Sequence, residues 1–367
     1  MKKLTVILCA LVCAAVLCAL PFLCVHANIL PEVSTAYYEY KAKEEALTAT
    51  GPEAELMRML TGLTADTKLE PVSTPIAFSW YGMALAVGAA AALTVLYALG
   101  RKKPALHSAL LWSGTLALPF ALIGARLVYC AVNIAFYLQD IAAPMAMLKV
   151  WEGGLSLSGA LVFIVLAGIL GAKAGKAPVG QMLHALVPAM YILAMASAAA
   201  SRIIHMGYGP EMAEGFLSID INGTPRLDTA WLVIILVGLT VLITTLRLQK
   251  TSIPAASRFA LYAFLYGTVM ILLESLRKDG HMVWGFVHAE MLFDLFFALG
   301  GLLYLARTKK RILLSLLATA VLAGAVVALE FALDRSAIGD GLLYAAYVLL
   351  LALYGTLGCS FLRKARN

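Results

Sequence analysis

The sequence predicts an all-α integral membrane protein with about ten transmembrane helices. The chain of 367 residues is 62% hydrophobic and only 13% charged, whereas soluble domains average about 25% charged residues. Its apolar runs are long enough to cross a hydrocarbon core of about 30 Å, which takes roughly 20 residues of helix. The runs do not alternate polar with apolar residues as barrel strands would, so we expect them to satisfy their backbone as helices.

The predicted spans and the basic residues support each other. The spans cover about residues 4–23, 77–99, 107–133, 155–172, 182–201, 229–246, 258–276, 285–306, 312–333 and 341–362. Most of the 28 Lys and Arg residues cluster at residues 2–3, 101–103, 173–176, 247–258, 307–311 and 363–366. If ten spans alternate, every cluster lies on one side, which is the positive-inside pattern. We therefore expect both termini to be cytoplasmic. The net charge of +7 then reflects topology, and nucleic acid is not an expected partner.

The first 23 residues are either a transmembrane helix or a signal peptide. They have a basic start and an apolar stretch, and Val25-His26-Ala27 is a passable cleavage site. Cleavage would leave nine spans. Nearly all of the six cysteines fall inside apolar runs without metal-ligand spacing, so we interpret them as small apolar residues.

Polar complexity is concentrated on the side opposite the basic clusters. Residues 24–76 combine helical spacing with mixed charge, which predicts a small external helical cap. Residues 205–228 are rich in Gly and turn residues, which predicts a loop or small lobe on the same face. There is no P-loop and no dinucleotide fingerprint. We therefore expect any chemistry on the external face, and we expect neither an ATPase nor a cofactor or metal.

Three arginines lie within or at the ends of predicted spans, where an ionisable group costs at least about 2.5 kcal/mol. They are Arg126, Arg202 and Arg277, and the topology places all three in the outer half of the bundle. Arginines near a headgroup layer are suited to bidentate capture of phosphate. We predict that they bind a phospholipid headgroup, and that Gly153–Gly154 lets it approach the backbone. Simple packing of Arg126 and snorkelling of Arg202 are the alternatives.

Two further groups of ionisable residues fall at span ends. Glu274 is three residues before Arg277, so it can form a structural ion pair or orient the arginine in a site. His205 is one helical turn after Arg202 and is either a solvated loop residue or a base. His288, Glu290 and Asp294 begin the eighth span. They resemble a metal-binding set, although a hydrogen-bonded cluster inside the bundle is the more common arrangement.

Five segments resemble, in order, the motifs of the prolipoprotein diacylglyceryl transferase family. The segments are FSWYGMALAVG (78–88), GARLVY (124–129), VWEGGLSLSGA (150–160), SRIIHMGYG (201–209) and LYGTVMILLESLRKD (265–279). They are similar to the family's Trp-Tyr-Gly, Gly-Gly-Arg-x-x-Tyr, Trp-x-Gly-Gly-hydrophobic-Ser-x-His-Gly, Gly-Arg-x-x-Asn and Tyr-Gly-x-x-Arg-x-x-x-Glu-x-x-Arg patterns. The resemblance covers residues 77–306, a domain of seven helices. Residues 1–23, the cap at 24–76 and the two C-terminal helices at 307–367 lie outside it.

The resemblance implies a transferase in the bacterial plasma membrane, with its site on the external face. Such enzymes move a diacylglyceryl group from phosphatidylglycerol to the thiol of a lipobox cysteine in a prolipoprotein. The residues implied for catalysis are His205, Tyr81 and Glu274. Those implied for binding the lipid substrate are Arg126, Arg202, Arg277, Gly153, Gly154, Ser156 and Ser158.

Three positions differ from the family's motifs. Ser158 stands where the family has His, His205 where it has Asn, and Met270 where it has the first Arg of the seventh-span motif. The first change removes a candidate base, which we expect His205 to replace. One alternative is a degenerate relative that binds phospholipid or lipoprotein without turnover. Another is a proton-coupled transporter that uses His288, Glu290 and Asp294.

Overall fold

The structure is a computed structural model that describes residues 3–23, 43, 79–138, 147–148, 154–248, 252–306, 308–335 and 339–364. The expected external cap at 24–76 lies outside the described residues, apart from Lys43, and so does Gly153. The helices of 17 residues or more in the described chain are α1 (Lys3–Leu23), α4 (Trp80–Lys102), α5 (Pro104–Val132), α8 (Leu157–Ala174), α9 (Val179–Ile203), α10 (Thr229–Leu248), α11 (Ala255–Ser275), α12 (Ala289–Leu305), α13 (Lys309–Arg335) and α14 (Asp340–Lys364).

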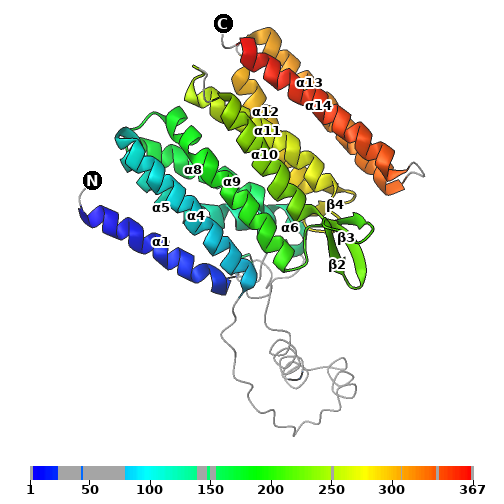
Figure 1. The fold of residues 1–367 in the computed structure, drawn as a ribbon, viewed down its shortest axis with the longest axis horizontal. Coiled ribbons are helices and arrows are strands. Elements are labelled where there is room, and N and C mark those ends of the chain that lie inside the picture. The colour runs from blue at the N-terminus through cyan, green and yellow to red at the C-terminus, as the bar shows by residue number, and fades with distance from the viewer. Residues whose placement is uncertain are drawn as a thin grey trace.

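These helices confirm the predicted all-α membrane fold. Each corresponds to one predicted span, and eight of those in the described chain are long and apolar enough to cross a membrane. The other two are α1 and the 17-residue α12. The helices lie side by side, with α1, α4 and α5 at one edge and α13 and α14 at the other (Figure 1). Both chain termini lie at one end of this bundle, and the β-strands lie at the other.

Glycines allow the closest helix contacts in the bundle. A Cβ on Gly124 of α5 would lie 2.6 Å from the backbone oxygen of Gly159 of α8. Between α11 and α12, a Cβ on Gly267 would lie 2.1 Å from the Asp294 oxygen, and one on Gly301 would lie 2.3 Å from the Ala260 oxygen. Small residues are favoured at such contacts because lipid gives no hydrophobic drive for helix association, so close packing must supply it.

Helix α1 packs onto the domain that resembles the transferase family. The Ser79 N–H, just before α4, donates to the Pro21 oxygen at 2.8 Å. A Cβ on Gly82 would lie 2.2 Å from the Leu20 oxygen, so the two backbones nearly touch. At the other edge, the buried Tyr347 hydroxyl of α14 donates to Glu330 of α13 at 2.9 Å.

The segment predicted as a loop or small lobe forms a three-stranded antiparallel sheet. Its strands are β1 (Tyr208–Glu211), β2 (Ser218–Ile221) and β3 (Thr224–Asp228), in the order β1-β3-β2. Asn222 and Gly223 have φ values of 54° and 80° and join β2 to β3. An Asn-Gly pair with both φ values positive is the preferred two-residue hairpin turn, so the local sequence accounts for the sheet.

The predicted eighth span begins later than the sequence indicated. Residues 285–288 belong to a hairpin of β4 (Val283–Trp284) and β5 (Val287–His288), and helix α12 starts only at Ala289. Gly285 has a φ of 63° and lies in the turn of this hairpin. The first residues of the apolar run are therefore not helical. The consequence is that Glu290 lies in the first turn of α12.

Candidate active site

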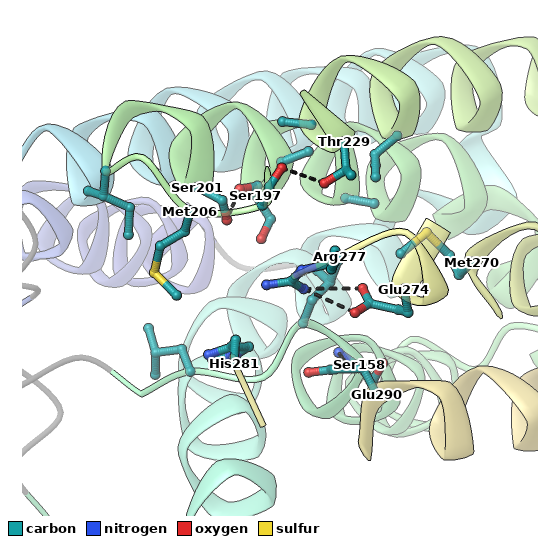
Figure 2. A pocket seen from close by; sticks show the side chains of 18 of the residues that line it. Ser158, Ser197, Ser201, Met206, Thr229, Met270, Glu274, Arg277, His281 and Glu290 are labelled. Carbon is teal, nitrogen blue, oxygen red and sulfur yellow. Dashed lines mark hydrogen bonds and ion pairs between the residues drawn. The ribbon is translucent and has the colours of Figure 1, made fainter. Parts of the chain in front are cut away.

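A pocket of about 300 Å³ lies between the helices at the end of the bundle that carries the strands. Its walls come from α4, α5, α8, α9, α10, α11 and α12 and from the loops beside them (Figure 2). The polar and ionisable residues in its lining are Tyr81, Tyr129, Ser158, Ser197, Ser201, Thr229, Glu274, Arg277, His281 and Glu290. Helices that are far apart in the sequence thus bring their polar residues to one place.

The guanidinium of Arg277 is held between two carboxylates. Its Nη1 donates to both oxygens of Glu274, at 3.2 and 3.1 Å, and its Nη2 donates to Asp279 at 2.7 Å. Its Nε is buried and has no hydrogen-bond partner among the described residues. The two Nη atoms therefore fix the plane of the guanidinium, and Figure 2 shows its pair with Glu274.

Asp279 joins the loop after α11 to the loop after α9. Its carboxylate accepts the Gly207 N–H at 2.7 Å and the His281 N–H at 3.3 Å in addition to the bond from Arg277. Burial alone would raise the pKa of Asp279, but the Arg277 guanidinium and these two N–H groups hold that pKa below its usual value. The carboxylate is therefore ionised at neutral pH and keeps the Arg277 side chain in position.

His281 is the histidine in the pocket lining. Its ring stacks on Tyr129 with 5.8 Å between the ring centroids. Burial and the nearby positive charge of Arg277 lower the pKa of His281 below its usual value, while the Glu290 carboxylate works in the opposite direction. The imidazole is therefore neutral at pH 7, the form that can accept a proton.

Glu290 faces the position at which the family's histidine is replaced. Its Oε2 accepts the backbone N–H of Ser158, the second residue of α8, at 3.2 Å. Both residues are buried and both line the pocket. The Glu290 carboxylate lies at the start of α8 as well as in the first turn of α12, where the helix dipoles favour a negative charge. The two helices together hold Glu290 at the pocket wall.

His288 and Asp294, which the sequence grouped with Glu290, have different surroundings. The ring nitrogens of His288 hydrogen-bond to the backbone oxygens of His281 and Arg277, at 3.3 and 3.1 Å, so His288 supports the pocket loop. Asp294 is 1% exposed, and its carboxylate oxygens have no hydrogen-bond partner among the described residues. In the described part of the chain, no three His, Cys, Asp or Glu side chains are grouped to hold a metal ion.

Arg126 lies behind the pocket wall and does not line it. Its Nε donates to the Met147 oxygen at 2.9 Å and its Nη1 to the Gly154 oxygen at 3.3 Å. Its guanidinium also lies 5.8 Å from the centroid of the Tyr129 ring. Because Gly154 and Tyr129 are both lining residues, Arg126 positions two parts of the wall.

Replacing Gly154 by Ala is expected to damage the pocket more than the same change at Gly285. Both glycines have positive φ, 69° and 63°, so Ala at either costs roughly 1–2 kcal/mol of backbone strain. At Gly154 a Cβ would also lie 2.4 Å from the Tyr129 ring, whereas nothing lies within 4 Å at Gly285. This crowding adds about 1–3 kcal/mol. Thermal melts of both variants in detergent measure the difference, and equal losses would contradict the close contact.

Arg202 and His205 lie outside the pocket. Arg202 forms an ion pair with Asp228 through its Nε, and its side chain is 45% exposed. His205 has a φ of 54° and is exposed at the end of α9. The neighbouring Ser201 does line the pocket. Of the three predicted phosphate-binding arginines, the structure therefore brings only Arg277 into the pocket.

An apolar cavity of about 130 Å³ adjoins the pocket. Tyr81, Leu155, Leu157 and Ser197 line both spaces. Ser156 lines the apolar cavity and accepts the Gly159 N–H at 3.0 Å, which caps helix α8. The remaining walls are mostly aliphatic and include Val16 and Leu20 of α1. A polar chamber and an apolar chamber thus share one wall.

The sequence identified part of this pocket and overlooked the rest. Tyr81, Gly154, Ser158, Glu274 and Arg277 were predicted as site residues and line it. His281, Tyr129 and Asp279 were not assigned a role, although Tyr129 ends the GARLVY motif. A signal for the other two was available, because the polar stretch RKDGH (277–281) begins at Arg277 and lies between two predicted spans.

Comparisons with known proteins identify relatives of this chain. The family model for prolipoprotein diacylglyceryl transferase matches residues 71–307. A phosphatidylglycerol–prolipoprotein diacylglyceryl transferase of Clostridium novyi is 28% identical over 255 residues, which cover 62% of this chain and 94% of that protein. Proteins of the same name from Listeria monocytogenes and Streptococcus pneumoniae are 25% identical over 240 residues and 24% over 258. These matches cover 59% and 66% of this chain and 82% and 96% of the relatives.

Proposed function

The chain belongs to the prolipoprotein diacylglyceryl transferase family, and we propose that it transfers a diacylglyceryl group from phosphatidylglycerol to the cysteine thiol of a lipobox-bearing prolipoprotein. The observation that carries the proposal is the shared wall between a polar pocket with a guanidinium and an apolar cavity. A phospholipid has the same two parts, a phosphate headgroup and acyl chains. Tyr81 lines both spaces, so we propose that it lies near the glycerol carbon that the reaction attacks.

In the proposed reaction, the thiol gives its proton to a base and its sulfur forms a bond to the terminal glycerol carbon of the diacylglyceryl group. The bond from that carbon to the phosphate oxygen breaks, and its electron pair leaves with glycerol phosphate. The guanidinium of Arg277, which lines the pocket, donates to a phosphate oxygen, where negative charge increases as the bond breaks. Glu274 and Asp279 orient the guanidinium for this contact.

We propose His281 as the base, in preference to the exposed His205. Its imidazole lines the pocket, is neutral at pH 7 and stacks on a second lining residue, Tyr129. Glu290 and Ser158 also line the pocket and bind the polar part of the substrate. Arg126 and Gly154 shape the wall behind the headgroup. Arg202 acts from the rim, where Asp228 holds it.

We place the pocket on the external face of the bacterial plasma membrane. Basic residues at helix ends away from the strands, such as Arg101, Lys102 and Lys173, follow the positive-inside rule. On this orientation the strands β1–β3 and residues 24–76 are external, where a translocated prolipoprotein is presented. The acceptor cysteine then reaches the pocket from outside the membrane.

A second candidate function is phospholipid binding without turnover. The specific observation that favours it is that two of the departures from the family motifs, Ser158 and Met270, both line the pocket. Met270 puts a thioether where the family has a guanidinium, so one phosphate contact of the family is lost here.

One assay separates the two functions. Purified protein in detergent receives phosphatidylglycerol and a lipobox peptide, and mass spectrometry measures the diacylglyceryl adduct on the cysteine. We expect an adduct that Arg277→Gln abolishes. The matched control is Arg226→Gln, which removes an arginine that pairs with the exposed Glu211 in the strand lobe. Phosphatidylglycerol that co-purifies with a protein that forms no adduct would overturn the transferase and support the second function.

A further inference from the structure

The end of the bundle opposite the active-site pocket carries a second polar pocket, of about 270 Å³. Its polar lining residues are Lys103, Gln181, His184 and Arg258, and Leu106, Ile253 and Ala255 complete it. It lies at the start of α9, whereas the active-site pocket lies at the end of the same helix. His184 and Ser201 are separated by about 25 Å, since a helix rises about 1.5 Å per residue.

This pocket collects positive charge, and its lining holds no carboxylate. Lys103 and Arg258 line it, and no acidic residue does. The sequence explains why. Asp and Glu are absent from residues 71–139, 153–210, 229–273, 295–329 and 341–367, which include every loop at this end of the bundle. The loops around the pocket therefore favour an anionic ligand over a cationic one.

The backbone adds to the preference for an anion, and one lining side chain has a ring nitrogen without a partner. Helices α5, α9 and α11 all begin at this pocket, and none of the three has a side-chain cap at its first turn. The positive ends of their dipoles therefore point toward the pocket. The His184 ring is fixed by stacking on Tyr262 at 6.1 Å, and its buried Nδ1 has no hydrogen-bond partner among the described residues.

A backbone hydrogen bond fixes the orientation of Arg258 in this pocket. Its Nε donates to the Ile253 oxygen at 3.0 Å, which folds the side chain back over the start of α11. Lys103 lies between α4 and α5 and is exposed. One cation is thus positioned by the backbone, and the second is an exposed lysine on a long aliphatic stem.

We propose that this pocket binds the phosphate group of an anionic ligand at the cytoplasmic end of the bundle, separately from the active-site pocket. The expected source is the headgroup of an anionic phospholipid in the inner leaflet, because basic pockets between transmembrane helices at this depth recognise such headgroups. Free phosphate offers the same chemistry. The proposal does not depend on whether the protein transfers a diacylglyceryl group.

The test uses the full chain in detergent and counts bound phosphatidic acid by native mass spectrometry, with phosphatidylcholine as the comparison lipid. The double variant Lys103→Gln/Arg258→Gln is expected to bind phosphatidic acid roughly tenfold more weakly than the native chain, since each cation near the headgroup contributes. The matched control is Lys102→Gln/Arg247→Gln, which removes two cations from the same end that do not line the pocket. The control is expected to stay within about twofold of the native chain, because direct contact and not the general charge of the face governs binding.

A second variant keeps the test valid if the first one folds poorly. Gln181 is exposed, so Gln181→Glu leaves the packing intact and places a carboxylate in the pocket. We expect it to weaken phosphatidic acid binding by a similar factor. Lipid held in the active-site pocket is common to all variants and cancels in the comparison. Equal losses in the pocket and control pairs, or no loss with Gln181→Glu, would overturn the proposal.

A final arm identifies the source of the phosphate. Inorganic phosphate is added at millimolar concentration to the complex with phosphatidic acid. Displacement of the lipid supports a site that free phosphate also fills, and retention supports a site for the membrane headgroup.

Discussion

Replacing Arg277 by Gln is expected to cause the largest loss of stability together with a large loss of activity. Glu274 is 5% exposed and the Asp279 side chain is 1% exposed, so both carboxylates would stay buried without their cation. Removing one partner of a buried ion pair costs about 3–5 kcal/mol. Transfer is expected to fall by about 100-fold or more, because a donor to the developing charge is lost. Thermal melts and the peptide assay measure the two effects.

A triple variant separates the two roles of this arginine. Arg277→Gln combined with Glu274→Gln and Asp279→Asn leaves no charge on any of these three residues, so we expect most of the stability to return. The amide oxygen that replaces the Asp279 carboxylate can still accept the Gly207 N–H that links the two loops. Transfer should stay lost, because no cation replaces the guanidinium. Full transfer by the stabilised triple variant would mean that Arg277 only supports the fold.

Replacing His281 by Gln is expected to lower the turnover rate by roughly 10²- to 10⁴-fold, the usual contribution of a general base. The apparent affinity for phosphatidylglycerol should change little, because Arg277 and the apolar cavity are untouched. His205→Gln is the matched control. Because His205 is exposed and lies outside the pocket, we expect that variant to keep its rate. If His205→Gln lowers the turnover rate and His281→Gln does not, His205 is the base, as the sequence predicted.

The same assignment predicts a pH profile and its direction. A histidine base works only when neutral, so the rate should fall as the pH drops through its pKa. Burial and Arg277 lower the pKa of His281, so the fall should come below the ordinary histidine value of about 6.5. The Glu290 carboxylate raises this pKa. Glu290→Gln, which can still accept the Ser158 N–H, should therefore move the fall to still lower pH.

The motif resemblance predicted more of the pocket-lining residues than the search for arginines in predicted spans did. Glu274 and Arg277 are three residues apart on a helix, so their pairing follows from local geometry alone. The grouping of Arg126, Arg202 and Arg277 was inferred from topology, which fixes depth in the membrane but not the direction of a side chain. The partners of Arg126 and Arg202 are the Met147 oxygen and Asp228, and these come from distant segments.

The sequence by itself determined the all-α membrane class, the positions of the spans and the end of the bundle on which polar residues gather. These follow from hydropathy, length and the distribution of charge, which act along the chain. Only the tertiary structure decided that Arg277, His281 and Glu290 share one pocket while His205 does not. Contacts of that kind depend on how separate helices pack, because successive residues of a helix point about 100° apart and the rotation of each helix decides which of them faces the pocket. The hairpin before α12 sets that rotation for Glu290.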